Sequence, residues 1–165
     1  MSERQAALGS TMTLNGRIRS SEADGASSPS PSDRRVIDGA GGYLVPGLWD
    51  MHGHLSLSDG ILNMASGVVN VRDIGNEHEN IMDVASKFNS GTVIGPNVFR
   101  AGFMDKAGPY AAGYPAESLE DALERVDFFA EHGYLQVKLY SSIEPEWVAP
   151  IAERTHKHGM RLSGH

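Results

Sequence analysis

The sequence contains no cysteine, which excludes disulfide bonds and thiolate metal ligands. It also lacks any block of like charges, and 14 Lys and Arg against 21 Asp and Glu give a net charge of −7. This balance argues against nucleic acid or an anionic membrane surface as the main partner. No apolar run approaches the roughly 20 residues of a membrane-spanning helix, and the start MSERQAALGS has no secretory signal pattern. We therefore expect a cytoplasmic protein whose metals, if any, are held by nitrogen and oxygen.

The first 45 residues differ in composition from the rest of the 165-residue chain. Residues 21–34, SEADGASSPSPSDR, are rich in Ser and Pro and are typical of a flexible loop. Before them, TMTLNGRIRS alternates like two strands around an Asn-Gly turn. Residues 1–45 thus indicate a remnant of a small β element, and a partly disordered leader over residues 1–34 is the alternative.

From Pro46 onward, strand and helix patterns alternate. YLVPGLWDM at residues 43–51 reads as a first strand, and further apolar, β-branched runs occur at residues 67–75, 96–103, 135–142 and 160–165. The clearest helical pattern runs from Ser118 to His132, with Ser118 and Asp121 placed as a capping box. The next runs from Glu144 to His158, where Pro150 is expected to kink the helix or delay its start.

Glycines mark the joints of this alternation. Each stands just after a helical pattern and just before a strand, where a left-handed residue stops a helix: Gly67, Gly91, Gly133 and Gly159. His132 and His158 precede two of them, so we expect both imidazoles to serve at helix ends. The strand–helix order predicts a parallel sheet with right-handed crossovers, closed into a barrel or left open.

The most suggestive short motif is PGLWDMHGHLS, which places His52 and His54 one residue apart. The spacing alone is weak evidence, because composition predicts it about 0.3 times in such a chain. In a strand, however, residues i and i+2 point the same way, whereas on a helix they lie about 200° apart. Lys138 and His165 fall near the ends of two later strands. In parallel α/β sheets, functional sites form at these carboxyl ends, so all four side chains could face the same end of the sheet.

Five stretches together resemble the amidohydrolase superfamily, closest to its imidazolonepropionase-like and prolidase-like branch: IDGAGGYLVPGLWDMHGHLS, GVVNVRDIGN, GPNVFRAGF, QVKLYSSI and HKHGMRLSGH. The resemblance covers Val36 to His165, and NGRI is similar to that family's N-terminal β-sandwich. It implies an α/β fold in which residues 46–165 form about strands 1–5 of a (β/α) TIM barrel. A sandwich remnant, residues 1–45, precedes it.

The resemblance also implies roles for individual residues. His52 and His54 would bind the first of two metals, a carboxylated Lys138 would bridge both, and His165 would bind the second. Zinc is the expected metal, with Mn, Co or Fe as alternatives. A metal-bridged hydroxide would then hydrolyse a C–N bond in a cyclic amide or dipeptide. Tyr140 follows Lys138 on the same strand face and is a candidate substrate-binding residue.

Each assignment has a plainer alternative. A strand lysine is usually solvated, but QVKLY is apolar on both sides of Lys138. His165 is the last residue and could be a mobile end. Asp50, Arg72 and Asp73 could orient ligands or form structural ion pairs, and His78 and His156 fall in helical stretches where exposure is expected.

Residues 46–165 are about half of the roughly 250 residues of a complete barrel. The family's strand-six histidine and its strand-eight aspartate, the general base, have no counterpart here. We therefore expect a truncated hydrolase with little activity alone. The alternative is a non-catalytic remnant or an assembly partner that completes its barrel with another chain, since open sheet edges favour homo-oligomers or aggregation. A phosphoesterase that uses His-x-His fits the motifs less well.

Overall fold

The computed structural model describes residues 9–14, 17–23, 37–109, 111–112 and 114–165. The chain divides into two compact units, residues 1–46 and residues 47–165. We describe each unit by itself.

The first unit contains a two-stranded antiparallel sheet. Strands β1 (Gly9–Leu14) and β2 (Arg17–Ala23) pair from Gly9 opposite Ala23 to Leu14 opposite Arg17. The strand alternation expected on either side of the Asn-Gly step is thus confirmed, and the step itself lies outside the described residues. Residues 21–23 belong to β2, so the predicted loop starts too early, and its remainder, 24–34, is also outside the described residues.

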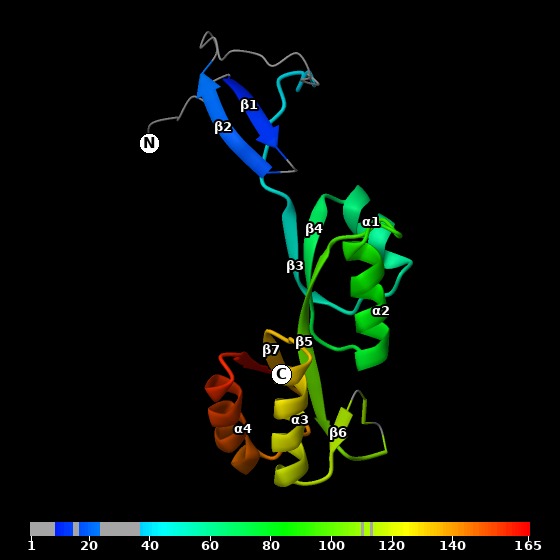
Figure 1. The fold of residues 1–165 in the computed structure, drawn as a ribbon, viewed down its shortest axis with the longest axis vertical. Helices are drawn as coiled ribbons and strands as arrows, with labels where there is room; N and C mark the ends of the chain where they lie inside the picture. The colour runs from blue at the N-terminus through cyan, green and yellow to red at the C-terminus, as the bar shows by residue number, and fades with distance from the viewer. Residues whose placement is uncertain (1–8, 15–16, 24–36, 110, 113) are drawn as a thin grey trace. The chain divides into compact units, whose positions relative to one another are not determined.

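The second unit is built on a curled parallel sheet, which confirms the expected half-barrel of five strands (Figure 1). The order is β3 (Leu48–Gly53), β4 (Val68–Asp73), β5 (Asn97–Lys106), β7 (Gln136–Leu139) and β8 (Arg161–Gly164). The short β6 (Tyr114–Ala116) pairs with the end of β5. The first strand begins at Leu48 and not at Tyr43, because Pro46 donates no backbone hydrogen bond to a ladder.

Four helices connect these strands and cover one face of the sheet. They are α1 (Asp59–Ala65), α2 (His78–Asn89), α3 (Leu119–Glu131) and α4 (Pro145–Lys157). The core between helices and sheet contains Val71, Phe129, Val137 and Ile151, all at most 1% exposed. The longest described helices have 13 residues, so none of the described helices could cross a membrane.

Local signals explain where the helices begin. The Ser118 hydroxyl accepts a hydrogen bond from the Asp121 N–H (3.1 Å), and the Asp121 carboxylate accepts one from the Glu117 N–H (3.0 Å). The capping box is therefore formed, with its second bond one residue earlier than the standard pattern. Helix α4 begins at Pro145, so the delayed start expected from Pro150 is wrong. Pro at the first helical position is already set for helix, and this fixes the start.

The four glycine joints adopt the predicted left-handed conformation, with φ between 69° and 80°. The two helix-end histidines differ in what they bond. His132 Nδ1 lies 2.8 Å from the Phe128 carbonyl oxygen in the last turn of α3, as expected of a helix end. His158 follows the last residue of α4, but its Nε2 lies 2.7 Å from Asp127 Oδ1 of α3, so its ring links the two helices.

Gly102 of β5 is required by close packing. A Cβ atom at this position would lie 2.3 Å from Cγ of Phe129, whose ring is 1% exposed. Gly102→Ala is expected to lower the free energy of unfolding by about 1–3 kcal/mol, because a fully buried ring must shift. Urea denaturation measures this loss. Gly108→Ala, where a Cβ meets nothing within 4 Å, is the matched control. Equal effects of the two substitutions would contradict the packing argument.

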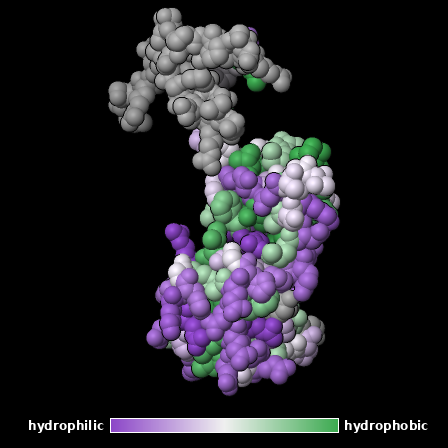
Figure 2. Space-filling view, viewed as in Figure 1, coloured by the Kyte–Doolittle hydropathy of each residue, from purple (hydrophilic) through white to green (hydrophobic). Residues whose placement is uncertain are grey.

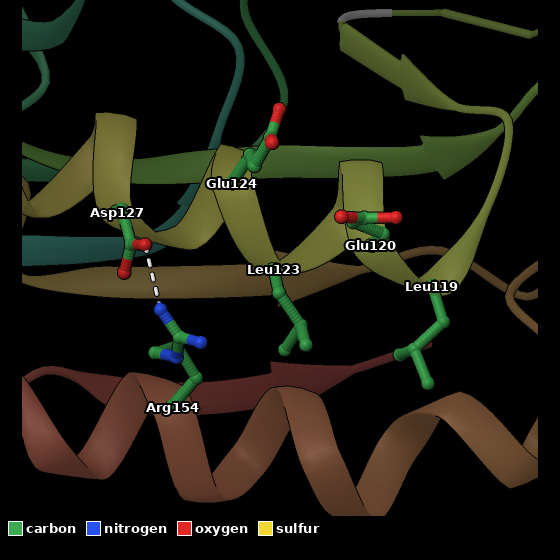
Figure 3. Close-up of a pocket in the computed structure, with 6 residues that line it drawn as sticks. All are labelled: Leu119, Glu120, Leu123, Glu124, Asp127 and Arg154. Carbon is green, nitrogen blue, oxygen red and sulfur yellow. Dashed lines mark hydrogen bonds and ion pairs between the residues drawn. The ribbon is translucent and has the colours of Figure 1, made fainter.

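A groove runs between α3 and α4 on the helical layer (Figure 3). Leu119 and Leu123 point from α3 toward α4, and Arg154 donates a hydrogen bond to Asp127 Oδ2 at 2.7 Å. Partial burial alone would raise the pKa of Asp127, but hydrogen bonds from His158 and Arg154 outweigh it and lower the pKa. The groove is thus part of the contact between the two helices.

The Asp127–Arg154 pair gives an expected pH dependence. A lowered carboxyl pKa stabilises the fold above the unfolded pKa of about 4, and this stability is lost as pH falls through the folded value. Both side chains are more than a third exposed, so solvent screening limits the coupling to about 0.5–1 kcal/mol at pH 7. A double-mutant cycle of Asp127→Asn and Arg154→Met measures it. Coupling that stays constant from pH 7 to about pH 2 would contradict this account.

Candidate metal centre

The sheet has an inner face opposite the helices, and Lys138 lies on it. Val71 and Val137 point into the core at 0% exposure. Because side chains alternate along a strand, Arg72 on β4 and Lys138 on β7 point to the inner face. Phe103 of β5 is opposite Lys138 in the ladder and shares that face.

His52 and His54 come together through an irregularity in β3. Asp50 pairs with Val71 and Gly53 with Asp73. Two residues of β3, at positions 51 and 52, therefore lie opposite the single residue 72 of β4. This bulge contains His52, and His54 follows the end of the strand. The two ring centroids lie 5.4 Å apart. A local bulge, and not simple alternation along a flat strand, therefore sets the spacing of the two imidazoles.

The His54 ring is held by the loop after β4. Its Nδ1 lies 3.0 Å from the Gly75 carbonyl oxygen, and since a carbonyl only accepts, Nδ1 carries the proton. Neutral His54 then presents an unprotonated Nε2, the arrangement typical of metal-binding histidines. A Cβ on Gly75 would lie 2.3 Å from His54 Cε1, so only glycine leaves space for this ring.

Two carboxylates fix the backbone around the histidines. Asp73, 1% exposed, accepts hydrogen bonds from the Leu55 N–H (2.6 Å) and Asn76 Nδ2 (2.7 Å). Burial raises the pKa of Asp73, although these bonds act in the opposite direction. Asp50 accepts from the His52 N–H at 2.9 Å. Among the described residues neither carboxylate forms an ion pair, so both act on the backbone beside the imidazoles.

Lys138 is buried, at 5% exposure, as the apolar residues around it in the sequence indicate. Burial lowers the pKa of its amine, and the positive charge of Arg72 lowers that pKa further. Both effects favour the neutral amine, the form that reacts with electrophiles. The alternative of a solvated edge lysine is therefore wrong for the structure of this chain.

Tyr140 and His165 form an aromatic pair near the end of the β7 and β8 strands. Their rings stack with centroids 4.9 Å apart and planes 13° apart, and Tyr140 also packs edge-on against Phe103 at 5.4 Å. His165 is exposed, and Tyr140 is 39% exposed. The pair thus lies beside the carboxyl end of β7, where Tyr140 is partly exposed.

The donors fit a divalent ion only in part. In the stretches that the structure describes, no three His, Cys, Asp or Glu side chains lie close enough to hold one ion. His52 and His54 form a two-nitrogen pair suited to zinc and related metals, beside an open depression lined by β3 and α1 residues such as Asp50, Leu62 and Asn63. The assignment of His52, His54, Lys138 and His165 as ligands stays a prediction.

Sequence reasoning missed two residues that support these positions. Asn76 links Asp73 to the Leu55 carbonyl (2.9 Å), and Gln136 links Arg72 to Ser163. Both are polar residues near strand termini. That position was the available signal, but apart from Asp73, three residues from Asn76, their partners lie 21 or more residues away in the chain.

The chain is similar in fold to several solved structures, although its sequence differs from theirs. No protein-family model matches the sequence, and no curated protein matches it significantly. A protein from Bifidobacterium longum described as a prolidase shares 21% identity at a TM-score of 0.76, over 91% of this chain and 42% of its own. Bottromycin amidohydrolase shares 22% identity at a TM-score of 0.64, over 73% of this chain and 28% of its own. Molinate hydrolase shares 16% identity at a TM-score of 0.70, over 91% of this chain and 47% of its own. This chain spans less than half the length of each, and over that length it has the fold of these hydrolases.

Proposed function

We propose that residues 47–165 carry part of the active site of a metal-dependent amidohydrolase that cleaves a C–N bond in a cyclic amide or a dipeptide. The position of Lys138 is the observation that supports this most strongly. It is a buried lysine on the inner face of a parallel half-barrel similar to solved hydrolases, and no carboxylate of the described chain pairs with it. An unpaired buried amine is costly, so its position favours a chemical role.

Each proposed ligand has a specific task. His52 and His54 would hold the first ion through ring nitrogens, with Gly75 orienting His54. Lys138, carboxylated by carbon dioxide, would offer oxygens to both ions, and His165 would add an imidazole to the second. A bound divalent ion, zinc or one of Mn, Co and Fe, polarises a carbonyl and lowers the pKa of water. Tyr140 would orient the substrate through its hydroxyl.

The test is metal stoichiometry, with hydrolysis measured in parallel. Because no three His, Cys, Asp or Glu side chains of the described residues lie close enough to hold one ion, we expect weak binding: at equilibrium with an excess of Zn²⁺ and bicarbonate, the chain should take up close to two ions by elemental analysis. Lys138→Met should lower that number to about one or less, because the bridge between the ions is lost. Dipeptides and cyclic amides are the substrates to screen. Equal metal content in the wild type and in Lys138→Met would contradict the proposal.

A second candidate, an assembly partner without catalysis, is favoured by exposed apolar side chains. Ile61 and Leu62 of α1 are 59% and 65% exposed, and Trp49 and Met51 of β3 are about half exposed. Figure 2 shows the contrast between apolar surface near α1 and the hydrophilic surface over α3 and α4. Such surface favours association. Sedimentation that shows a stable complex, together with no retained metal, would support this candidate over the hydrolase.

A further inference from the structure

A polar chain crosses the inner face of the sheet at the level of Lys138. Arg72 Nε donates to the Met51 carbonyl oxygen at 2.8 Å, next to His52 in β3. Arg72 Nη1 reaches Gln136 Oε1 at 3.5 Å, and Gln136 Nε2 donates to the Ser163 hydroxyl. One guanidinium thus ties the strand that carries the histidines to the strand that carries Lys138.

The same face holds Lys138 and Arg72, and the exposed Arg161 lies opposite Gln136. By the same alternation Asp105 of β5 lies on this face, but its carboxylate accepts hydrogen bonds from the N–H groups of Lys106 and Ala112 and from the Ser142 hydroxyl. Gln136 precedes Lys138 by two residues on β7, so the bond from Arg72 to Gln136 brings its charge to the lysine side of the sheet. Lys138 is 5% exposed and Arg72 is half-buried. Neither side chain forms an ion pair within the described part of the chain. A partly desolvated cation pair of this kind lacks an anion, since like charges in a low-dielectric region repel strongly.

We propose that Arg72 is a positioning residue for Lys138, and that its guanidinium is the counter-ion of the carbamate formed when the lysine amine takes up carbon dioxide. The inference rests on the proposed function for the carbamate itself, and adds that Arg72 holds this group before any metal binds. The amine lone pair attacks the carbon of CO₂ and an N–C bond forms. One C=O electron pair moves onto oxygen, and the nitrogen loses a proton to solvent. The product, –NH–COO⁻, replaces repulsion with a charge-assisted hydrogen bond.

The experiment is ¹³C NMR of the metal-free full chain, treated with chelator and supplied with ¹³C-bicarbonate. We expect a carbamate carbonyl resonance in the wild type that is absent in Lys138→Arg. Arg72→Met should lower its occupancy about tenfold or more, the size of a lost charged hydrogen bond. Arg72→Lys should retain most of the signal because it retains the charge. Arg161→Met is the matched control, because Arg161 is an exposed cation opposite Gln136 in the β8 ladder.

Circular dichroism and thermal unfolding establish that each variant is folded. If Arg72→Met does not fold, Arg72→Gln provides a neutral side chain that still donates to the Met51 carbonyl. The inference is overturned if the neutral variant has the wild-type occupancy, if Arg161→Met reduces the signal equally, or if the metal-free wild type shows no carbamate. A chain that binds no metal would contradict the proposed hydrolase site, but this metal-free measurement would be unaffected.

Discussion

The chain with both His52→Ala and His54→Ala is expected to bind Zn²⁺ at least about 100-fold more weakly than the wild type. Loss of a supporting group beside a metal ligand already costs about 10–100-fold, so loss of two nitrogen donors should cost more. The two rings lie 5.4 Å apart, and Nε2 of His54 is unprotonated in the neutral ring. Competition with a chromophoric chelator measures the affinity.

The chain provides its own control for this experiment. His156 and His158 form a second His-x-His in the sequence, but at the end of α4, where the rings diverge and His158 bonds to Asp127. Replacing both by alanine should leave zinc affinity within about twofold. Gly75→Ala keeps all the histidines but displaces the His54 ring, so an intermediate loss of about tenfold is expected. Equal losses in the two double variants would refute the site.

Asp73→Ala is expected to lower the free energy of unfolding by about 2–4 kcal/mol. Asp73 is 1% exposed, and its removal leaves the buried Leu55 N–H without an acceptor. An unsatisfied buried donor costs about 1–3 kcal/mol, and the vacated volume adds to this. Because Leu55 follows His54, zinc affinity should fall as well. Chemical denaturation monitored by circular dichroism measures the stability.

Asp83→Ala is the matched control for Asp73. Asp83 lies on the exposed side of α2 and pairs with Lys87 at 2.6 Å, with side chains 53% and 40% exposed. Its removal should cost less than about 0.5 kcal/mol. Asp73→Asn keeps an oxygen for the Leu55 N–H, so its loss in free energy of unfolding should lie between those of Asp73→Ala and Asp83→Ala. A cost for Asp73→Ala no larger than that for Asp83→Ala would show that the carboxylate does not hold this loop.

The local part of the fold could be predicted because its signals lie within a few residues of one another. The capping box at Ser118 and Asp121, the helix-ending glycines and the β-branched runs each act over less than one turn or strand. The parallel order then follows from chain connectivity. The burial of Lys138 could also be predicted, because its flanking residues are apolar.

The remaining features depend on contacts between residues far apart in the sequence. Three hydrogen bonds join residues 18 to 64 positions apart in the sequence: His54 with Gly75, Leu55 with Asp73, and Arg72 with Gln136. A sequence pattern shows that each residue is polar or small but not which partner it meets. The start of β3 depends on pairing for a related reason: apolar residues 43–45 resemble a strand in the sequence, but β3 begins at Leu48.

The bulge in β3 makes the distance along the chain, and not only residue identity, part of the candidate site. Deleting Met51 would restore regular pairing with β4 between Asp50 and Gly53 while keeping both histidines in the chain. The deletion would place His52 opposite Arg72 and turn its side chain, while Gly53 stays opposite Asp73, so the separation of the two imidazoles would change. A protein with the same motif letters but a different count of residues in this strand would then present its imidazoles elsewhere. In this part of the sheet, the chain length between paired residues is itself a determinant of chemistry.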